Sequence, residues 1–260
     1  MTTASEQAAD LLLANWAATT RIAELPASVR PKTRADGYDV AAAVAERSGS
    51  AVAGWKIAAT SEAGQKHINV DGPIIGRILE RRLLPVSAAV TLGDNIMKVA
   101  EAEFAFRFGK DLPPRAEPYT LQEAMAAVAT LHLSIEVPDS RYQDFTKVGA
   151  AQLIVDTACA SWLVLGPAVD VPWQHIDLSA HVVTGLRNGA KVAEGTGKAV
   201  LGDPRKALAW FVNEASTYCG GVRSGQFVTT GTCIVPMAIA PGDEVAVDYG
   251  SLGRHSCRIV

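Results

Sequence analysis

Acidic residues alternate with apolar ones in a segment that runs from Ala100 to Phe108. Because successive side chains of a β-strand point to opposite faces, Glu101 and Glu103 would share one face of this strand. A second strand-like segment, residues 131–137, places Glu136 on the face opposite its core-facing leucine and isoleucine. The spacing predicts three carboxylates on two strands, and taken alone it is also typical of an ordinary solvated strand face.

Carboxylates that converge from two strands would indicate a cation. In a pocket of low dielectric constant, such charges repel one another by several kcal/mol unless a positive ion lies between them. Hard oxygen ligands suit Mg²⁺ or Mn²⁺, and these ions keep open positions for water or substrate. Zinc is a poor match, because the five histidines lie far apart in the sequence and no cluster of histidine and cysteine has zinc-site spacing.

Polar residues in apolar or glycine-rich surroundings are further candidates. Lys56 stands inside the apolar segment 54–58, where a lysine either extends to solvent or is buried beside a partner and becomes a useful acid or base. Asp71 precedes a Gly-Pro pair, a position where aspartate is also favoured simply as a turn residue. Thr232 lies in a hydroxyl-rich segment in which Gly231 permits close approach of the backbone to a ligand.

Two common enzyme classes lack their motifs in this chain. The glycine-rich segment 195–202 matches neither the dinucleotide fingerprint nor the phosphate-binding loop. The chain has no Gly-x-Ser-x-Gly elbow, so a serine hydrolase is unsupported.

The elements that must position the candidate residues mix helices and strands. Helical patterns cover residues 4–18, 36–47 with Asp36 as its cap, a segment from Thr60 to about His67, 120–129 and 204–218. Strand-like segments lie at 53–57, 97–108, 131–137, 158–165, 178–186, 191–195, 227–235 and 244–249. The pair Asn188-Gly189 is typical of a tight hairpin turn. This order predicts an α+β fold rather than repeating βαβ units.

The composition is that of a globular protein. Of the 260 residues, 48% are hydrophobic and 20% are charged, and the net charge of −3 leaves no basic field, so we expect no nucleic-acid partner. No apolar run approaches the ~20 residues of a membrane helix, and the acidic start lacks the basic region of a secretory signal. Four scattered cysteines indicate free thiols. We expect a cytoplasmic protein that binds a small molecule and no membrane.

Taken in order, the motifs resemble those of the fumarylacetoacetate hydrolase superfamily. Within it they are most similar to the group of 2-keto-4-pentenoate (2-hydroxypenta-2,4-dienoate) hydratases and 4-oxalocrotonate decarboxylases. The matching segments are Gly54–Ala58, Val70–Pro73, Glu101–Glu103, Glu136–Arg141, Asp156–Ala158, Gly202–Pro204 and Thr230–Thr232. They cover most of the chain beyond residue 50, and their order and spacing are more specific than any one of them.

The resemblance implies a fold and a metal site. The fold would be a mixed β-roll core in residues 86–260, preceded by a smaller, mainly helical N-terminal region in residues 1–85. A divalent cation, Mg²⁺ or Mn²⁺, would be held by Glu101, Glu103 and Glu136. By analogy the chain would form a homo-oligomer.

The resemblance also implies roles for residues near a bound 2-oxo or 2-hydroxydienoic acid. Lys56, with a pKa lowered by burial or by the metal charge, would transfer protons, and Asp71 would orient Lys56 or the attacking water. Thr232 would hydrogen-bond the substrate carboxylate. Ser161 is a further substrate-binding candidate, in the segment Asp156–Ser161 where this chain departs from the pattern of the hydratases.

The reaction that the resemblance favours is hydration of a 2-hydroxy-2,4-dienoate to a 4-hydroxy-2-oxo acid. A metal that binds the C1 carboxylate and the C2 oxygen would stabilise the charge that builds there, and this also suits the main alternative, decarboxylation of a 4-oxalocrotonate-type acid. A hydrolase that cleaves C–C bonds of acylpyruvates would need a histidine near the metal. A fourth alternative is a non-catalytic partner that assembles with an active enzyme.

Overall fold

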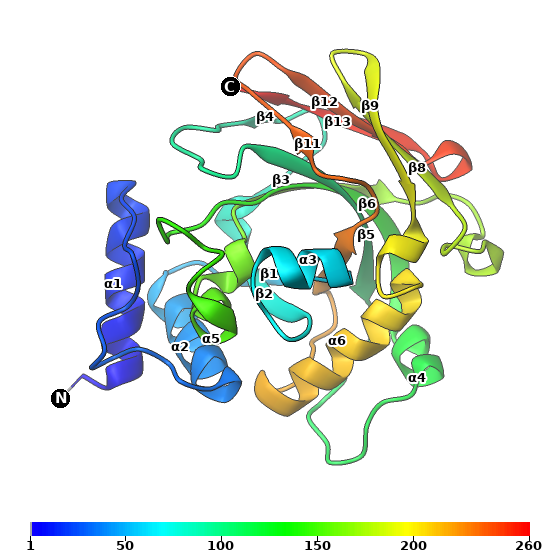
Figure 1. Cartoon of the computed structure of the whole chain (residues 1–260). Coiled ribbons are helices and arrows are strands. Elements are labelled where there is room, and N and C mark those ends of the chain that lie inside the picture. The colour runs from blue at the N-terminus through cyan, green and yellow to red at the C-terminus, as the bar shows by residue number, and fades with distance from the viewer. Residues whose placement is uncertain (1) are drawn as a thin grey trace.

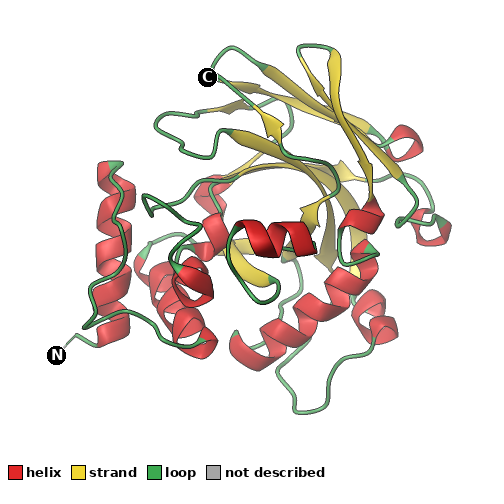
Figure 2. Cartoon of the chain, in the orientation of Figure 1, coloured by secondary structure: helices red, strands yellow, loops and turns green. Residues whose placement is uncertain are grey.

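The computed structural model describes residues 2–260, which fold around two mixed β-sheets flanked by helices (Figures 1 and 2). The large sheet has the strand order β2-β1-β10-β5-β6-β7-β3, with β11 paired to β5, and the small sheet has the order β4-β13-β12-β8-β9. In Figure 1 the small sheet lies above the large one, with α1, α2 and α5 on one side and α4 and α6 below. The predicted α+β fold is therefore confirmed.

The large sheet is formed by β1 (Val52–Ala58), β2 (Ile74–Leu79), β3 (Leu83–Leu84), β5 (Val99–Phe108), β6 (Val128–Val137), β7 (Trp162–Ala168), β10 (Phe227–Thr232) and β11 (Met237–Ala238). The small sheet is formed by β4 (Ala89–Val90), β8 (Val182–Arg187), β9 (Ala190–Thr196), β12 (Glu244–Asp248) and β13 (Arg254–Ile259). The α-helices are α1 (Ala4–Ala18), α2 (Arg34–Arg47), α3 (Glu62–His67), α4 (Leu121–Ala126), α5 (Gly149–Val155) and α6 (Pro204–Tyr218). Short 3₁₀ helices are η1 (Glu80–Arg82), η2 (Thr157–Cys159), η3 (Trp173–His175), η4 (Gly197–Ala199) and η5 (Gly250–Leu252).

Local signals predicted several elements well. Helices α1 and α6 have the bounds expected from the sequence. The Asn188-Gly189 hairpin between β8 and β9 is confirmed, and both residues have the positive φ that its turn requires, 53° and 79°. The predicted cap of α2 was wrong. Thr33 caps this helix, while Asp36 occupies the third helical position and bonds back to the Thr33 amide.

The segment after residue 155 differs most from the prediction. A strand was expected from Ala158, but residues 157–159 form the tight turn η2, and β7 begins only at Trp162. The turn packs against Gly76 of β2, and Arg141 pairs with Asp156 directly before it. The helix expected over 120–129 is also shorter than predicted, because residues from Val128 onward pair with β5 as part of β6.

Strand β5 separates a packed face from a polar one, as its alternation predicted. Phe104, Phe106 and Phe108 are at most 1% exposed. Phe104 packs edge-on against Tyr249 at the end of β12, with 5.1 Å between ring centroids. The apolar face of β5 therefore packs toward the small sheet, and Glu101 and Glu103 point from the opposite face.

The N-terminal part of the chain contributes to both helices and sheet. Residues of α1, α2 and α5 form a separate apolar cluster that includes Leu12, Val44 and Val155. Strands β1, β2 and β3 hydrogen-bond into the large sheet, so part of residues 1–85 belongs to the same sheet as β5 and β6. The domain boundary at residue 85 stays a prediction.

Two further expectations concern the whole chain. The four cysteines, Cys159, Cys219, Cys233 and Cys257, are free thiols. Within residues 2–260 we find no helix that combines the length and the hydrophobicity of a membrane span.

A partly buried histidine on β13, His255, makes the stability of the fold depend on pH. Burial lowers the pKa of His255 to about 4, and its buried Nε2 has no hydrogen-bond partner among the described residues. The folded protein keeps His255 neutral, whereas the unfolded chain takes up a proton near pH 6.5, so stability present above that pH is lost as the pH falls toward 4. We expect His255→Gln to reduce the loss of unfolding free energy between pH 7.5 and pH 5 by about 2 kcal/mol. Urea unfolding at the two pH values measures this difference, and equal losses in wild type and variant would contradict it.

Candidate metal centre and active site

The structure brings the predicted acidic residues together on one face of the large sheet. Glu101 lies directly opposite Glu136 in the antiparallel register of β5 and β6, and Glu103 follows two residues along β5. Each of these residues offers a carboxylate oxygen, and the three atoms lie within 4.8 Å of one another. Glu103 and Glu136 are fully buried, whereas Glu101 is half-buried. We call this group the carboxylate cluster.

The carboxylate cluster has unused bonding capacity. Oε1 of Glu103 and both carboxylate oxygens of Glu136 are buried and lack a hydrogen-bond partner among the described residues. The other oxygen of Glu103 accepts the backbone N–H of Gly231 at 2.9 Å. Buried polar atoms are normally satisfied, and a hard divalent cation would satisfy these oxygens while neutralising their charge. The donor set therefore fits Mg²⁺ or Mn²⁺.

The pKa values of the carboxylate cluster also show that its charged forms are unfavourable without a cation. Burial, reinforced by the charges of Glu136 and Glu101, raises the pKa of Glu103 well above its ordinary value. Burial raises the pKa of Glu101, although Lys56 opposes the shift. Burial likewise raises the pKa of Glu136 to about 7, against the opposing charge of Lys56. Without a cation, burial and mutual repulsion disfavour the charged forms of these carboxylates.

Lys56 is buried beside the carboxylate cluster, as the sequence allowed. Its Nζ lies 3.0 Å from Oε1 of Glu136 and donates a hydrogen bond of 3.0 Å to the carbonyl oxygen of Ala158. Burial by itself lowers the pKa of Lys56, but the charges of Glu136, Glu101 and Glu103 outweigh it and raise the pKa above its ordinary value. The expected lowering is therefore wrong for the protein without a metal. A lowered pKa of Lys56 would require that the charges of the neighbouring carboxylates be neutralised.

The contact between Lys56 and Glu136 depends on the curvature of the sheet. Strands β10 and β5 lie between β1 and β6, so Lys56 and Glu136 are separated by three strand spacings. In a flat sheet this distance is about 14 Å, too far for the two side chains to meet. The register between β10 and β5 shifts between Thr229 and Thr232, and such irregularities bend a sheet. The carboxylate cluster and Lys56 thus face each other across the concave side.

Asp71 is not brought to this group. It lies in the loop between α3 and β2 with 90% of its side chain exposed, and its ion pair is with Arg34, at 3.7 Å. Lys56 is 3% exposed and has its ion pair with Glu136. The proposed role of Asp71 in orienting Lys56 or water stays a prediction, and it would require the loop to turn this side chain inward.

Ser161 and Thr232 lie in different surroundings. Ser161 precedes β7 and lines a cleft of about 220 Å³ together with Arg82, Arg141 and Trp162, and none of the three clustered glutamates lines this cleft. Thr232 ends β10 opposite Glu103, and its hydroxyl donates to the carbonyl of Ile234 at 2.8 Å. The substrate-binding roles of both residues stay predictions.

Two backbone groups of the site were not predicted. The carbonyl of Ala158 fixes Lys56, and the amide of Gly231 fixes Glu103. Gly231 has a φ of +100°, and a Cβ there would lie 2.2 Å from Oγ1 of Thr60. The sequence signal for this close approach was the glycine among hydroxyl residues. Its amide contacts the carboxylate of Glu103, and the predicted approach to a ligand stays a prediction.

Buried charges of this kind are costly in a structural core and are typical of an enzyme site. A mixed sheet whose concave face carries a carboxylate trio and a lysine has the ligands that a hard cation prefers and a group suited to acid–base chemistry, and together they indicate an enzyme. The chain belongs to the fumarylacetoacetate hydrolase family, since the family model "Fumarylacetoacetate (FAA) hydrolase C-terminal" matches residues 83–260. The resemblance drawn from the motifs is confirmed.

Within this family, the chain is similar to 4-oxalocrotonate decarboxylases and to 2-keto-4-pentenoate hydratases. 4-Oxalocrotonate decarboxylase of Pseudomonas putida is 29% identical over 231 residues, which cover 88% of this chain and 86% of the relative. 2-Keto-4-pentenoate hydratase of Burkholderia vietnamiensis is 31% identical over 206 residues, which cover 79% of this chain and 77% of the relative. The solved structure of 4-oxalocrotonate decarboxylase from Pseudomonas putida G7, complexed with magnesium and adipate, superimposes with a TM-score of 0.87 at 26% identity. The superposition covers 98% of this chain and 97% of that one.

Proposed function

We propose that this enzyme is a divalent-metal-dependent hydratase that adds water to a 2-hydroxy-2,4-dienoate and yields a 4-hydroxy-2-oxo acid. The observation that carries the proposal is the set of buried oxygens of Glu103 and Glu136 that lack a hydrogen-bond partner among the described residues, beside the ammonium of Lys56. The similarity to 2-keto-4-pentenoate hydratases supports the substrate class. Mg²⁺ is the favoured ion, because a relative of the same fold is complexed with it.

Glu101, Glu103 and Glu136 would hold the metal. When bound, the cation supplies a Lewis acid that draws electron density from the oxygen at C2 of the substrate. The amide of Gly231 keeps one oxygen of Glu103 fixed, so that the carboxylate is oriented before the ion arrives. The half-buried position of Glu101 leaves one side of the cluster open toward a ligand.

Lys56 is the group that would hold and move the proton. Its ammonium has three N–H donors, one of which bonds to the carbonyl of Ala158, and its charge is paired with Glu136 at 3.0 Å. This leaves N–H donor capacity that could face a substrate. In hydration, Lys56 would deliver a proton to the far carbon of the dienol while the C2 hydroxyl loses its proton, which gives a 2-oxo-3-enoate; water then adds across C3 and C4, with its hydroxyl at C4 and its proton at C3.

A second candidate function is decarboxylation of a 4-oxalocrotonate-type acid. The structural similarity over nearly the whole chain favours it specifically. The same cation and Lys56 would serve, because the electrons of the departing carboxylate also flow toward the C2 oxygen. Hydrolysis of acylpyruvates has less support, since the acidic group found among residues 2–260 includes no histidine.

The test compares two substrates with and without metal. The enzyme is incubated with 2-hydroxypenta-2,4-dienoate and with 4-oxalocrotonate in the presence of Mg²⁺ or of a chelator, while dienol absorbance and carbon dioxide are followed. We expect metal-dependent loss of dienol absorbance, a 4-hydroxy-2-oxo acid as product and no carbon dioxide. Carbon dioxide from 4-oxalocrotonate without hydration of the dienoate would establish the decarboxylase instead. If neither substrate reacts and Mg²⁺ gives no protection against thermal unfolding, the chain is a non-catalytic partner.

A further inference from the structure

The turn that holds Lys56 is strained. Thr157, Ala158 and Cys159 are consecutive, buried and not glycine, yet their φ angles are 50°, 53° and 62°. A left-handed conformation costs a non-glycine residue about 1–3 kcal/mol, and it persists only where the surroundings enforce it. Since the carbonyl of Ala158 accepts the hydrogen bond of Lys56, the strain lies beside the proposed proton-transfer group.

Arg141 connects the two ends of this turn. Its Nη2 donates to the backbone carbonyl of Asp156 at 2.7 Å, and its Nη1 donates to the carbonyl of Ala160 at 3.2 Å. Its Nε also pairs with the carboxylate of Asp156, which is fully buried. One planar guanidinium thus ties the residue before the turn to the residue after it, a geometry that a lysine cannot reproduce.

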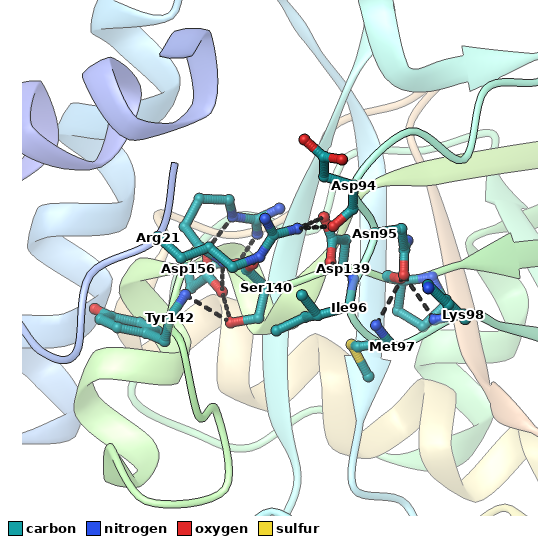
Figure 3. A network of polar contacts seen from close by, with 12 residues as sticks. Arg21, Asp94, Asn95, Ile96, Met97, Lys98, Asp139, Ser140, Tyr142 and Asp156 are labelled. Carbon is teal, nitrogen blue, oxygen red and sulfur yellow. Dashed lines mark hydrogen bonds and ion pairs between the residues drawn. The ribbon is translucent and has the colours of Figure 1, made fainter. Parts of the chain in front are cut away.

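We call Arg141 and Asp156, with their bonds to the two ends of the turn, the clamp, and neighbouring residues add further bonds to it. Ser140 donates its hydroxyl to Oδ2 of Asp156 at 2.7 Å, and the amide of Arg141 donates to the same oxygen at 3.1 Å. Figure 3 shows Ser140 and Asp156 in contact, with Tyr142 bonded to the Ser140 hydroxyl. The ring centroid of Trp16 from α1 lies 4.4 Å from the guanidinium carbon of Arg141, so the two groups form a cation–π contact.

The opposite side of the turn rests on β2. A Cβ at Gly76 would lie 1.8 Å from the carbonyl oxygen of Thr157, so only glycine lets the turn pack this closely. Gly76 is also the register partner of Lys56 in β1. The turn is therefore held between the strand pair that carries Lys56 and the Arg141–Asp156 ion pair.

We propose that Arg141 is a positioning residue for Lys56, acting through Asp156 and the strained turn of residues 157–159. The clamp keeps the carbonyl of Ala158 where it confines Nζ of Lys56 next to Glu136. This inference rests on the proposed function only for its effect on catalysis. The effect on the geometry of Lys56 is independent of the reaction.

The kinetic test uses Arg141→Lys, which keeps the buried positive charge but loses the bridge between the ends of the turn. Ser140→Ala removes one bond to Asp156 and is the milder variant if Arg141→Lys does not fold. We expect kcat to fall by about 10- to 100-fold in Arg141→Lys and by less in Ser140→Ala, with KM and the Kd for Mg²⁺ unchanged within about threefold. The matched control is Arg47→Gln, because Arg47 pairs with Asp10 and Glu6 on α1 and has no bond to Asp156, Ser140 or the turn.

A second readout needs no substrate. The ¹⁵Nζ NMR signal of Lys56, assigned by its absence in Lys56→Met, reports the environment of the ammonium. We expect this signal to shift or broaden in Arg141→Lys and Ser140→Ala and to stay in place in Arg47→Gln. A folded Arg141→Lys protein, or failing that Ser140→Ala, with wild-type signal and wild-type kcat would overturn the proposal. Wild-type protein that turns over neither substrate would refute the proposed function, while the NMR signal would still decide the role of the clamp.

Discussion

Lys56→Met is expected to lower kcat by about 10³-fold at saturating Mg²⁺, because general acid–base catalysis by one side chain is worth 10²- to 10⁴-fold. Methionine is close to lysine in length and suits a buried position, so the substitution removes the transferable proton without leaving a large cavity. The measurement is the rate of dienol loss, with substrate and metal varied separately.

The same substitution separates proton transfer from metal binding. Lys56 carries a positive charge 3.0 Å from Oε1 of Glu136, and this charge opposes a cation at the carboxylate cluster. The Kd for Mg²⁺, measured by calorimetry, should therefore stay the same or decrease in Lys56→Met. Lys206→Met, at an exposed position of α6, is the control and should keep wild-type kcat. A Lys56→Met enzyme within tenfold of the wild-type kcat would exclude Lys56 as the proton donor.

The carboxylate pair on β5 could be predicted because alternation along a strand is a local property. Glu101 and Glu103 share a face whatever the rest of the fold does, and the apolar residues between them identify the other face as packed. The pairing with Glu136 needed only that the next long strand along the chain be the antiparallel neighbour of β5, which is the commonest arrangement.

The position of Lys56 against Glu136 could not be predicted in the same way. It requires β10, far along the chain, to insert between β1 and β5, and it requires the sheet to curl. The direction of the pKa shift of Lys56 follows from that geometry, since three carboxylates outweigh the burial of one ammonium. Only the resemblance to a family placed these residues together in advance.

The turn at residues 157–159 was mistaken for the start of a strand because its sequence is apolar and its cause is distant. Ala158 and Cys159 give no local signal for a left-handed conformation, which is imposed by the Arg141–Asp156 ion pair and by the glycine at position 76. Asp71 shows the opposite case. Its motif is visible in the sequence, but the structure leaves the side chain in solvent.

Glu101→Gln is expected to weaken Mg²⁺ binding by at least about 100-fold, because loss of an outer-shell partner alone costs 10- to 100-fold and this change removes a charged ligand. Most activity should be lost at the metal concentration that suffices for the wild-type enzyme. Isothermal titration calorimetry measures the affinity. Full turnover at that metal concentration would contradict the assignment of Glu101 as a ligand.

The stability of the same variant should change in opposite directions with and without metal. In the metal-free protein, the charge of Glu101 adds to the burial that raises the pKa of Glu103, so glutamine at position 101 relieves repulsion and should raise Tm. With excess Mg²⁺, the wild-type protein gains stability by mass action and Glu101→Gln gains much less, so the order of the two Tm values reverses. Glu117→Gln, at an exposed loop position, should follow the wild type in both conditions. An equal Mg²⁺-dependent rise in Tm for Glu101→Gln and wild type would show that the ion binds without this carboxylate, and the three-carboxylate site would have to be abandoned.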